Sequence, residues 1–136
     1  MFTYLCLGTG DLQRSIRFYD PVMGALGHRR CVVQGEPGWD GWDGWAGWAI
    51  YEDRGARELA LSLCPHFDKR AATVGNGSMI ALKAVTWQQV DDFHAAALRF
   101  GGSSEGAPGL RPQYQPDFYA AYARDPDGHK LAAVCR

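Results

Sequence analysis

A strand followed by a helix occurs twice in this sequence, and this repetition constrains the fold more than any other feature. Residues 2–7 are apolar, aromatic and β-branched enough to form a strand. Residues 12–26 carry apolar side chains at steps of three and four, the spacing of one helical face. The same pattern recurs over residues 79–85 and 90–100, and residue 79 follows its equivalent, residue 4, by 75 positions (79 minus 4). Such self-similarity indicates an internal duplication.

Shorter strand-like stretches follow each predicted helix. They lie at residues 29–34, 47–51 and 58–64 in the first half, and at 111–115, 118–124 and 129–135 in the second half. The sequence therefore predicts an α+β fold with two βαβββ modules, about 1–66 and 77–136, within a single domain of residues 1–136.

Residues with strong end preferences mark where the two helices begin and end. Asp11 is a suitable N-cap for the first helix, and Gly27 is a suitable C-terminal stop. Pro21 is expected to kink or split this helix, because proline lacks the backbone donor and crowds the preceding turn. The second helix is predicted to begin with a capping box, in which the Thr86 hydroxyl accepts from a helical N–H and Gln89 reaches back.

Composition narrows the class of protein. The 136 residues are 46% hydrophobic and 12% aromatic with a formal charge of −1, and no basic run is long enough to follow a phosphate backbone. No apolar run approaches the roughly 18 residues of a membrane-spanning helix. The four cysteines include no C-x-x-C pair, which argues against a zinc knuckle or a dithiol redox site and leaves a disulfide open. We therefore expect a cytoplasmic protein with no nucleic-acid or membrane partner.

The segment Asp-Pro-Asp-Gly at residues 125–128 predicts a tight turn between the last two strands. Asp125 can accept from the backbone, and Gly128 can take a positive φ. Together with D-L-x-R-S-I-x-F-Y-D at residues 11–20, this turn makes the chain resemble the glyoxalase / bleomycin-resistance / extradiol-dioxygenase superfamily, also called vicinal oxygen chelate proteins. The resemblance covers almost the whole chain except residues 34–48. It implies that the two modules form curved mixed sheets around a cavity, with the helices outside.

The resemblance also implies positions for metal ligands. Metal-dependent members of the superfamily hold one divalent ion with His and Glu side chains, and two substrate oxygens chelate that ion. The corresponding positions here are Tyr4, Met79 and Ala132, and Glu58 is the only carboxylate in the strand that would supply a further ligand. A thioether and a methyl do not hold a hard or borderline divalent ion, and a neutral phenol is a poor ligand. We therefore expect no metal and no other cofactor.

The four histidines do not form an evident replacement site. His28 and His129 are expected to be exposed at a helix end and beside a turn, and His94 to be partly buried in the second helix. His66 is the best placed for the rim of a cavity. Cys64 and His66 lack a third group to orient them as a nucleophile pair. The sequence therefore assigns no catalytic residue.

Four of the five tryptophans recur every third residue up to Trp48. A period of three fits neither an amphipathic helix nor a strand, so this segment is predicted to be a loop that leads into a strand. One interpretation is a tandem expansion whose rings pack on the domain or on a partner subunit. The other is an aromatic lid, with Trp45 and Trp48 near the cavity mouth and with Asp40 and Asp43 attracting a cation. The lid agrees with superfamily members that sequester planar, basic drugs without a metal.

Strand alternation predicts which side chains line the cavity. Tyr119 and Tyr122 are an odd number of residues apart on one strand, so one of the two faces inward. A mostly apolar lining suits a hydrophobic or aromatic ligand. The predicted ligand-binding residues are Tyr4, Cys6, Met79, Ala132, Trp45, Trp48, Tyr119 and His66.

Three functions are compatible with the sequence. The preferred function is binding of a small hydrophobic or planar aromatic molecule by a superfamily member that lacks the usual metal ligands. The second is a metal-dependent lyase, isomerase or dioxygenase whose ligands have moved to residues such as Glu58 and His66. The third is a non-catalytic dimerisation module. A homodimer is expected, because superfamily members commonly pair to complete their cavities.

Overall fold

The computed structural model describes residues 2–31, 44–53, 56–65, 68 and 70–136. Within residues 50–59 it describes the backbone alone. His66 and most of the Trp-rich segment, including Asp40 and Asp43, lie outside the described residues.

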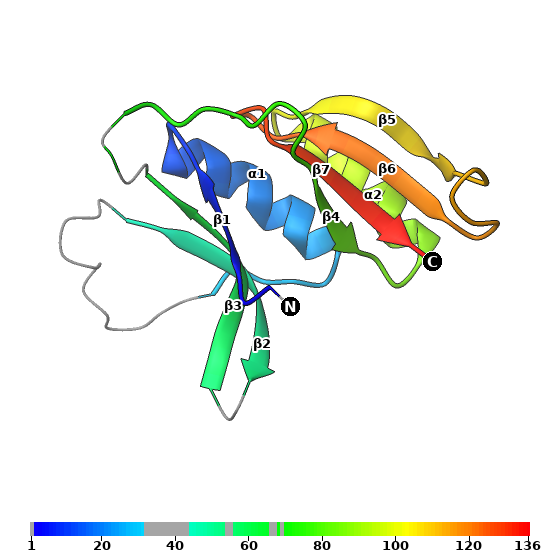
Figure 1. Ribbon diagram of the computed structural model, residues 1–136, viewed down its shortest axis with the longest axis horizontal. Helices are drawn as coiled ribbons and strands as arrows, with labels where there is room; N and C mark the ends of the chain where they lie inside the picture. Colours follow the sequence, from blue (N-terminus) through cyan, green and yellow to red (C-terminus); the bar gives the residue numbers. More distant parts are fainter. Residues whose placement is uncertain (1, 32–43, 54–55, 66–67, 69) are drawn as a thin grey trace.

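The described chain forms seven strands and two helices (Figure 1). The first half contains β1 (Leu5–Gly8), α1 (Leu12–Ala25), β2 (Ala46–Asp53) and β3 (Ala56–Cys64). The second half contains β4 (Ile80–Lys83), α2 (Trp87–Arg99), β5 (Ser103–Leu110), β6 (Tyr119–Arg124) and β7 (Lys130–Cys135). The α+β class is confirmed. Neither of the described helices is long and apolar enough to cross a membrane.

The two halves build mixed sheets of the same arrangement. The first sheet has the strand order β1-β3-β2 and the second has the order β4-β7-β6-β5. In each sheet the first strand of the half pairs in parallel with the last strand, and the other described strand pairs are antiparallel. Neither sheet closes into a barrel. The shared topology agrees with the duplication predicted from the sequence.

Helix α1 begins and ends where the sequence predicts. The Asp11 side chain accepts a hydrogen bond from the backbone N–H of Arg14 in the first turn. Gly27 takes a φ of 85° just past the helix end, a conformation that glycine adopts without strain. The predicted split at Pro21 is wrong, because α1 continues through this residue to Ala25 as one helix.

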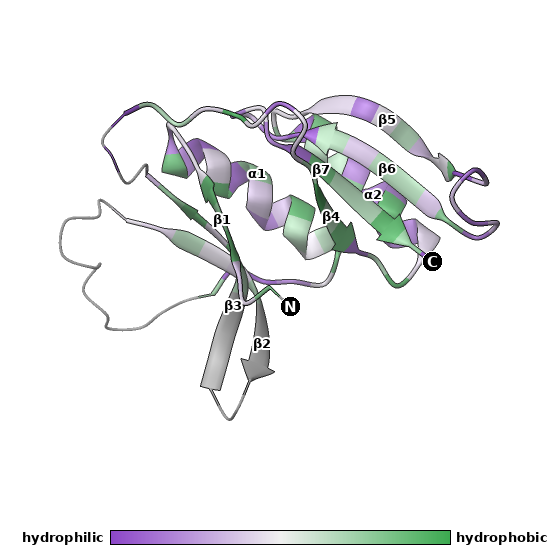
Figure 2. Ribbon diagram, viewed as in Figure 1, coloured by the Kyte–Doolittle hydropathy of each residue, from purple (hydrophilic) through white to green (hydrophobic). Residues whose placement is uncertain are grey.

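Helix α2 begins with the predicted N-cap Thr86, and the Gln89 side chain reaches back one residue further than in a capping box. The Thr86 hydroxyl accepts from the N–H of Gln89, whose side chain accepts from the N–H of Val85. The two helices pack against each other and share one hydrophobic core with both sheets. Figure 2 shows hydrophilic and hydrophobic residues interspersed along each helix, as expected when one helical face is buried. The largest fully buried side chains of this core include Phe18, Tyr19, Trp48, Phe93 and Leu131.

One strand prediction is wrong, and another falls partly outside the described residues. The strand predicted for 111–115 is wrong, because residues 111–118 form the turn-rich connection from β5 to β6. The chain instead forms β5 over the sequence SSEGAPGL, whose glycines and proline disfavour a strand. It does so as an edge strand, paired only with β6 and with register shifts between Ser104 and Gly109. Of the strand predicted for 29–34, residues 32–34 lie outside the described residues, and Arg30 forms an isolated antiparallel bridge with Trp48.

The predicted turn at 125–128 also connects the two halves of the protein. Gly128 takes a φ of 96°, as expected for this turn. The Asp127 carboxylate accepts hydrogen bonds from the Thr9 hydroxyl at 2.6 Å and the Ser15 hydroxyl at 2.9 Å, and it pairs with Arg14. Burial raises the pKa of Asp127, but these partners and a backbone N–H outweigh burial and hold the pKa below its ordinary value. A turn of the second half therefore anchors the first strand–helix connection.

Candidate functional site

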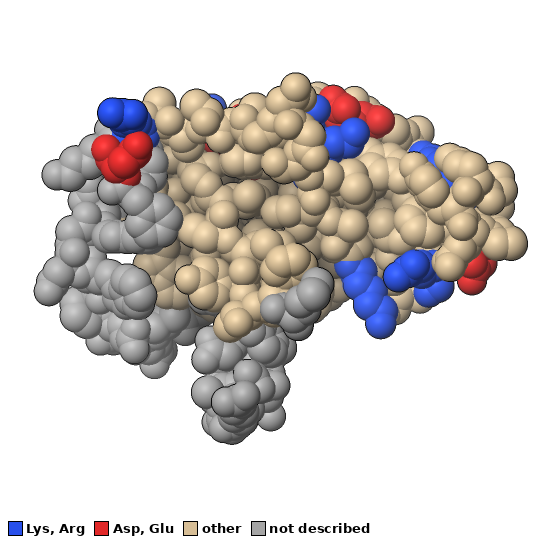
Figure 3. Space-filling view, viewed as in Figure 1, with Lys and Arg blue, Asp and Glu red and all other residues tan. Residues whose placement is uncertain are grey.

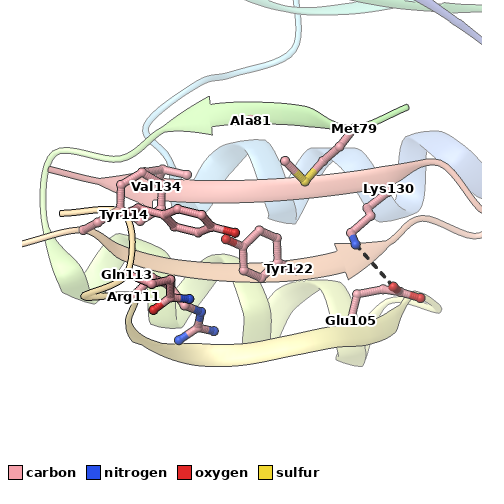
Figure 4. A pocket seen from close by; sticks show the side chains of 10 residues that line it. Met79, Ala81, Glu105, Arg111, Gln113, Tyr114, Tyr122, Lys130 and Val134 are labelled. Carbon is pink, nitrogen blue, oxygen red and sulfur yellow. Dashed lines mark ion pairs between the residues drawn. The ribbon is translucent and has the colours of Figure 1, made fainter. Parts of the chain in front are cut away.

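The face of the second sheet that lies away from the helices is hollowed into a pocket of about 590 Å³ (Figure 4). Its floor comes from β4, β6 and β7, whose residues alternate between the core and this pocket. The floor residues are Met79, Ala81, Tyr122, Lys130 and Val134.

The opposite wall comes from β5 and from the connection between β5 and β6. Glu105 and Arg111 contribute charges, Gln113 contributes an amide, and Tyr114 and Phe118 contribute aromatic rings that meet edge to face at 5.2 Å. Sequence analysis missed this wall, because it placed residues 111–115 in a strand. The described residues that line the pocket all belong to the second half of the chain.

Tyr122 lies between two cationic groups in this pocket (Figure 4). The guanidinium carbon of Arg111 is 5.6 Å from the centre of its ring, and the Lys130 ammonium is 5.8 Å from the same centre. Both distances fall within the range of cation–π attraction. Glu105 accepts from Arg124 at 2.8 Å and pairs with Lys130 at 3.5 Å. The hydrogen bond from Arg124 is the main reason that the pKa of Glu105 lies below its ordinary value.

A second hollow of about 240 Å³ lies where the two halves meet. Cys6 lines it from the first half, and Met79 and Lys130 line both hollows, which therefore adjoin. The Cys6 and Cys64 sulfurs are 3.0 Å apart, and both thiols are free. Burial raises the pKa of the Cys64 thiol to about 12, and the hydrogen bond with Cys6 adds to the increase. Figure 3 shows that the surface in the middle of this view is largely uncharged and that charged side chains of both signs lie around it.

The structure brings some of the predicted site residues together. Met79 lines the pocket. Ala132 lies on the same face of the sheet, because it pairs with Ala81 of β4 and with Tyr122 of β6, but it is fully buried. Tyr4 is 60% exposed at the start of the first sheet and lines neither of the hollows described above.

Of the two candidate tyrosines, Tyr122 lines the pocket and Tyr119 does not. The Tyr119 side chain packs against the hydrophobic core on the helix side of the sheet. Its hydroxyl donates to Asp91 at 2.9 Å, and its ring stacks on Trp87 with centres 4.5 Å apart. The hydrogen bond to Asp91 raises the pKa of Tyr119, and burial raises it further.

The two described tryptophans of the Trp-rich segment do not line either hollow. Trp48 is fully buried in the core beside Tyr19, and its ring N–H donates to Asp20 at 3.1 Å. Trp48 is therefore a core residue and does not lie at the mouth of either hollow. Trp45 is half-buried. The prediction for His66 lies outside the described residues.

Comparison with known proteins decides the family. The model of the Glyoxalase/Bleomycin resistance protein/Dioxygenase superfamily matches residues 2–133. The chain belongs to this superfamily. The structure of a glyoxalase/bleomycin resistance protein from Albidiferax ferrireducens T118 has 32% sequence identity and a TM-score of 0.80, over 100% of this chain and 99% of that one. No curated protein matches the chain.

Two more distant structures share the superfamily fold. A glyoxalase-related enzyme from Fulvimarina pelagi has 20% identity and a TM-score of 0.66, over 100% of this chain and 88% of that one. A fosfomycin resistance protein from Mesorhizobium loti has 13% identity and a TM-score of 0.60, over 100% of this chain and 92% of that one. These two show the fold alone.

The residues at the superfamily's metal-ligand positions do not fit a divalent ion. Met79 offers a thioether, Ala132 offers a methyl group, and the Tyr4 phenol lies on the other sheet outside the pocket. The side chain of Glu58 lies outside the described part of the chain. Among the described residues, no three His, Cys, Asp or Glu side chains gather into a group that would hold a metal.

Proposed function

We propose that this superfamily member binds a small planar aromatic molecule in the pocket over the second sheet, without a metal ion at the superfamily's usual position. The observation that carries the proposal is a pocket of about 590 Å³ bordered by the rings of Tyr114, Phe118 and Tyr122. Ligand sites are typically hollows of about this size, with apolar and aromatic linings and a few polar groups.

The floor and the wall of the pocket provide complementary contacts for a flat ring. Met79 is 47% exposed, and its polarisable thioether makes favourable contacts with aromatic rings. Ala81 and Val134 have small side chains, so the floor of the pocket is deeper at these two residues than at the larger side chains around them (Figure 4). Tyr114 is 62% exposed beside the pocket, where a bound ring would cover it. A flat molecule of two fused rings matches this arrangement.

Calorimetric titration with a panel of naphthalene and quinoline derivatives tests the proposal. Calorimetry is preferred to tryptophan fluorescence, because no described tryptophan lines the pocket. Tyr122→Ala removes the central ring and is expected to weaken binding about tenfold, which corresponds to about 1.4 kcal/mol. Tyr4→Ala is the matched control, since Tyr4 is exposed outside the pocket. Absence of binding across the panel, or equal affinity in both variants, would reject the proposal.

The metal-dependent enzyme, the homodimer and the dimerisation module remain predictions, and simple measurements test each of them. Elemental analysis of the purified protein tests the metal-dependent lyase, isomerase or dioxygenase, because such an enzyme carries stoichiometric metal. Light scattering tests the homodimer. A dimer that binds none of the aromatic compounds would favour the dimerisation module.

A further inference from the structure

We propose that the molecule bound in this pocket carries a carboxylate, which Arg111 and Lys130 recognise. The inference rests on the proposed function and adds the charge of the ligand to it. It follows from the balance of charges around the pocket, from the way Arg111 is held and from the position of both cations beside Tyr122.

Positive charge exceeds negative charge around the pocket. Glu105 is the one carboxylate among the described lining residues, and it is already shared between Arg124 at 2.8 Å and Lys130 at 3.5 Å. Arg111 forms no ion pair with any described carboxylate. Among the described lining residues, two cationic groups, Arg111 and Lys130, therefore face one anionic group, and a ligand with a negative charge would balance the excess.

The Arg111 guanidinium is held in place by the backbone. One terminal nitrogen donates to the carbonyl of Ala107 at 2.7 Å, and the other donates to the carbonyl of Leu110 at 3.1 Å. Arginine has five N–H donors in a rigid fork, so N–H groups stay available after these two bonds. A guanidinium fixed in this way loses little conformational entropy when it binds a carboxylate, whose planar pair of oxygens matches the fork.

The position of the cations suits an acid group attached to a flat ring. Arg111 and Lys130 both lie within 6 Å of the centre of the Tyr122 ring. A ring that covers Tyr122 would therefore bring its carboxylate within reach of either cation. The same charges would repel the basic planar compounds suggested by Asp40 and Asp43 in the sequence, because Glu105 is already neutralised by its two partners.

Titration of the protein with naphthoate and with naphthamide tests the inference, since the two probes share a ring system and differ in charge. Naphthoate is expected to bind at least about tenfold more tightly, as charge-assisted hydrogen bonds require. Raising NaCl from about 0.02 M to about 0.3 M is expected to weaken naphthoate binding and to leave naphthamide binding nearly unchanged.

Variants separate the role of Arg111 from general charge effects. Arg111→Gln is expected to weaken naphthoate binding about tenfold and to spare naphthamide. Arg17→Gln, an exposed change on α1, is the matched control and is expected to alter neither affinity. Lys130→Gln gives a second test if loss of Arg111 disturbs the β5–β6 connection. Equal binding of the two probes overturns the inference and leaves the proposed function standing, whereas absence of binding by both overturns both proposals.

Discussion

Replacing Asp127 with alanine is expected to destabilise the protein by about 3 kcal/mol at neutral pH. The carboxylate is 13% exposed and accepts from the hydroxyls of Thr9 and Ser15 while pairing with Arg14. A hydrogen bond to a charged group contributes about 1.5–3 kcal/mol. We count the two hydroxyl bonds near the lower limit and give the ion pair little weight, because the Arg14 side chain is 43% exposed.

The lowered pKa of Asp127 fixes the sign of the pH dependence. The pKa of an aspartate in the unfolded chain is about 3.9, and the pKa of Asp127 in the folded protein lies below its ordinary value. The stabilisation is therefore fully present above the unfolded pKa and is lost as the pH falls through the folded pKa. The difference in unfolding free energy between wild type and Asp127→Ala is expected to shrink below about pH 4.

Urea unfolding followed by circular dichroism measures both effects. Asp117→Ala is the matched control, because Asp117 is exposed in the connection between β5 and β6. The control is expected to change stability by less than about 0.5 kcal/mol. If Asp127→Ala were no more harmful than the control, or if its effect did not diminish in acid, the network around Asp127 would not join the two halves as described.

Three further predictions concern individual side chains and one glycine. Trp48→Ala is expected to cost about 3–5 kcal/mol in urea unfolding, because the ring is fully buried, and near-wild-type stability would contradict its place in the core. Iodoacetamide at about pH 8 is expected to label the exposed Cys6 far faster than Cys64, whose pKa of about 12 keeps it protonated. Peptide mass spectrometry measures the labelling, and equal rates would refute the burial of Cys64. Gly102→Ala is expected to cost about 1–3 kcal/mol, because a Cβ there would lie 2.4 Å from the carbonyl oxygen of Arg124, and an unchanged melting temperature would show that this contact relaxes freely.

Local signals in the sequence predicted the helix ends and the last turn. Asp11, Thr86, Gly27 and Gly128 act through the backbone within a few residues, so their roles depend little on the rest of the fold. The edge strand β5 was missed for the opposite reason. The glycines and the proline of β5 do not favour a strand, and β5 is a strand because it pairs with β6.

The candidate site was predicted in part. Alternation along β4 and β7 correctly put Met79 and Ala132 on one face, because this rule needs only the strand period. The alternation rule did not identify Arg111. This residue lines the pocket from the connection between β5 and β6, where side chains do not alternate as they do along a strand. Trp48 was assigned to a cavity mouth because its spacing matched a repeat, whereas packing against Tyr19 places it in the core.

We propose that the pocket over the second sheet holds a flat aromatic acid by its own side chains. The most direct test of this binding is calorimetric titration of the protein with naphthoate, before and after exhaustive treatment of the protein with a chelator. Elemental analysis of both protein samples accompanies the titrations. We predict the same dissociation constant in both samples and no stoichiometric metal in either. Binding that disappears on chelation and returns with one equivalent of a divalent ion would contradict the account.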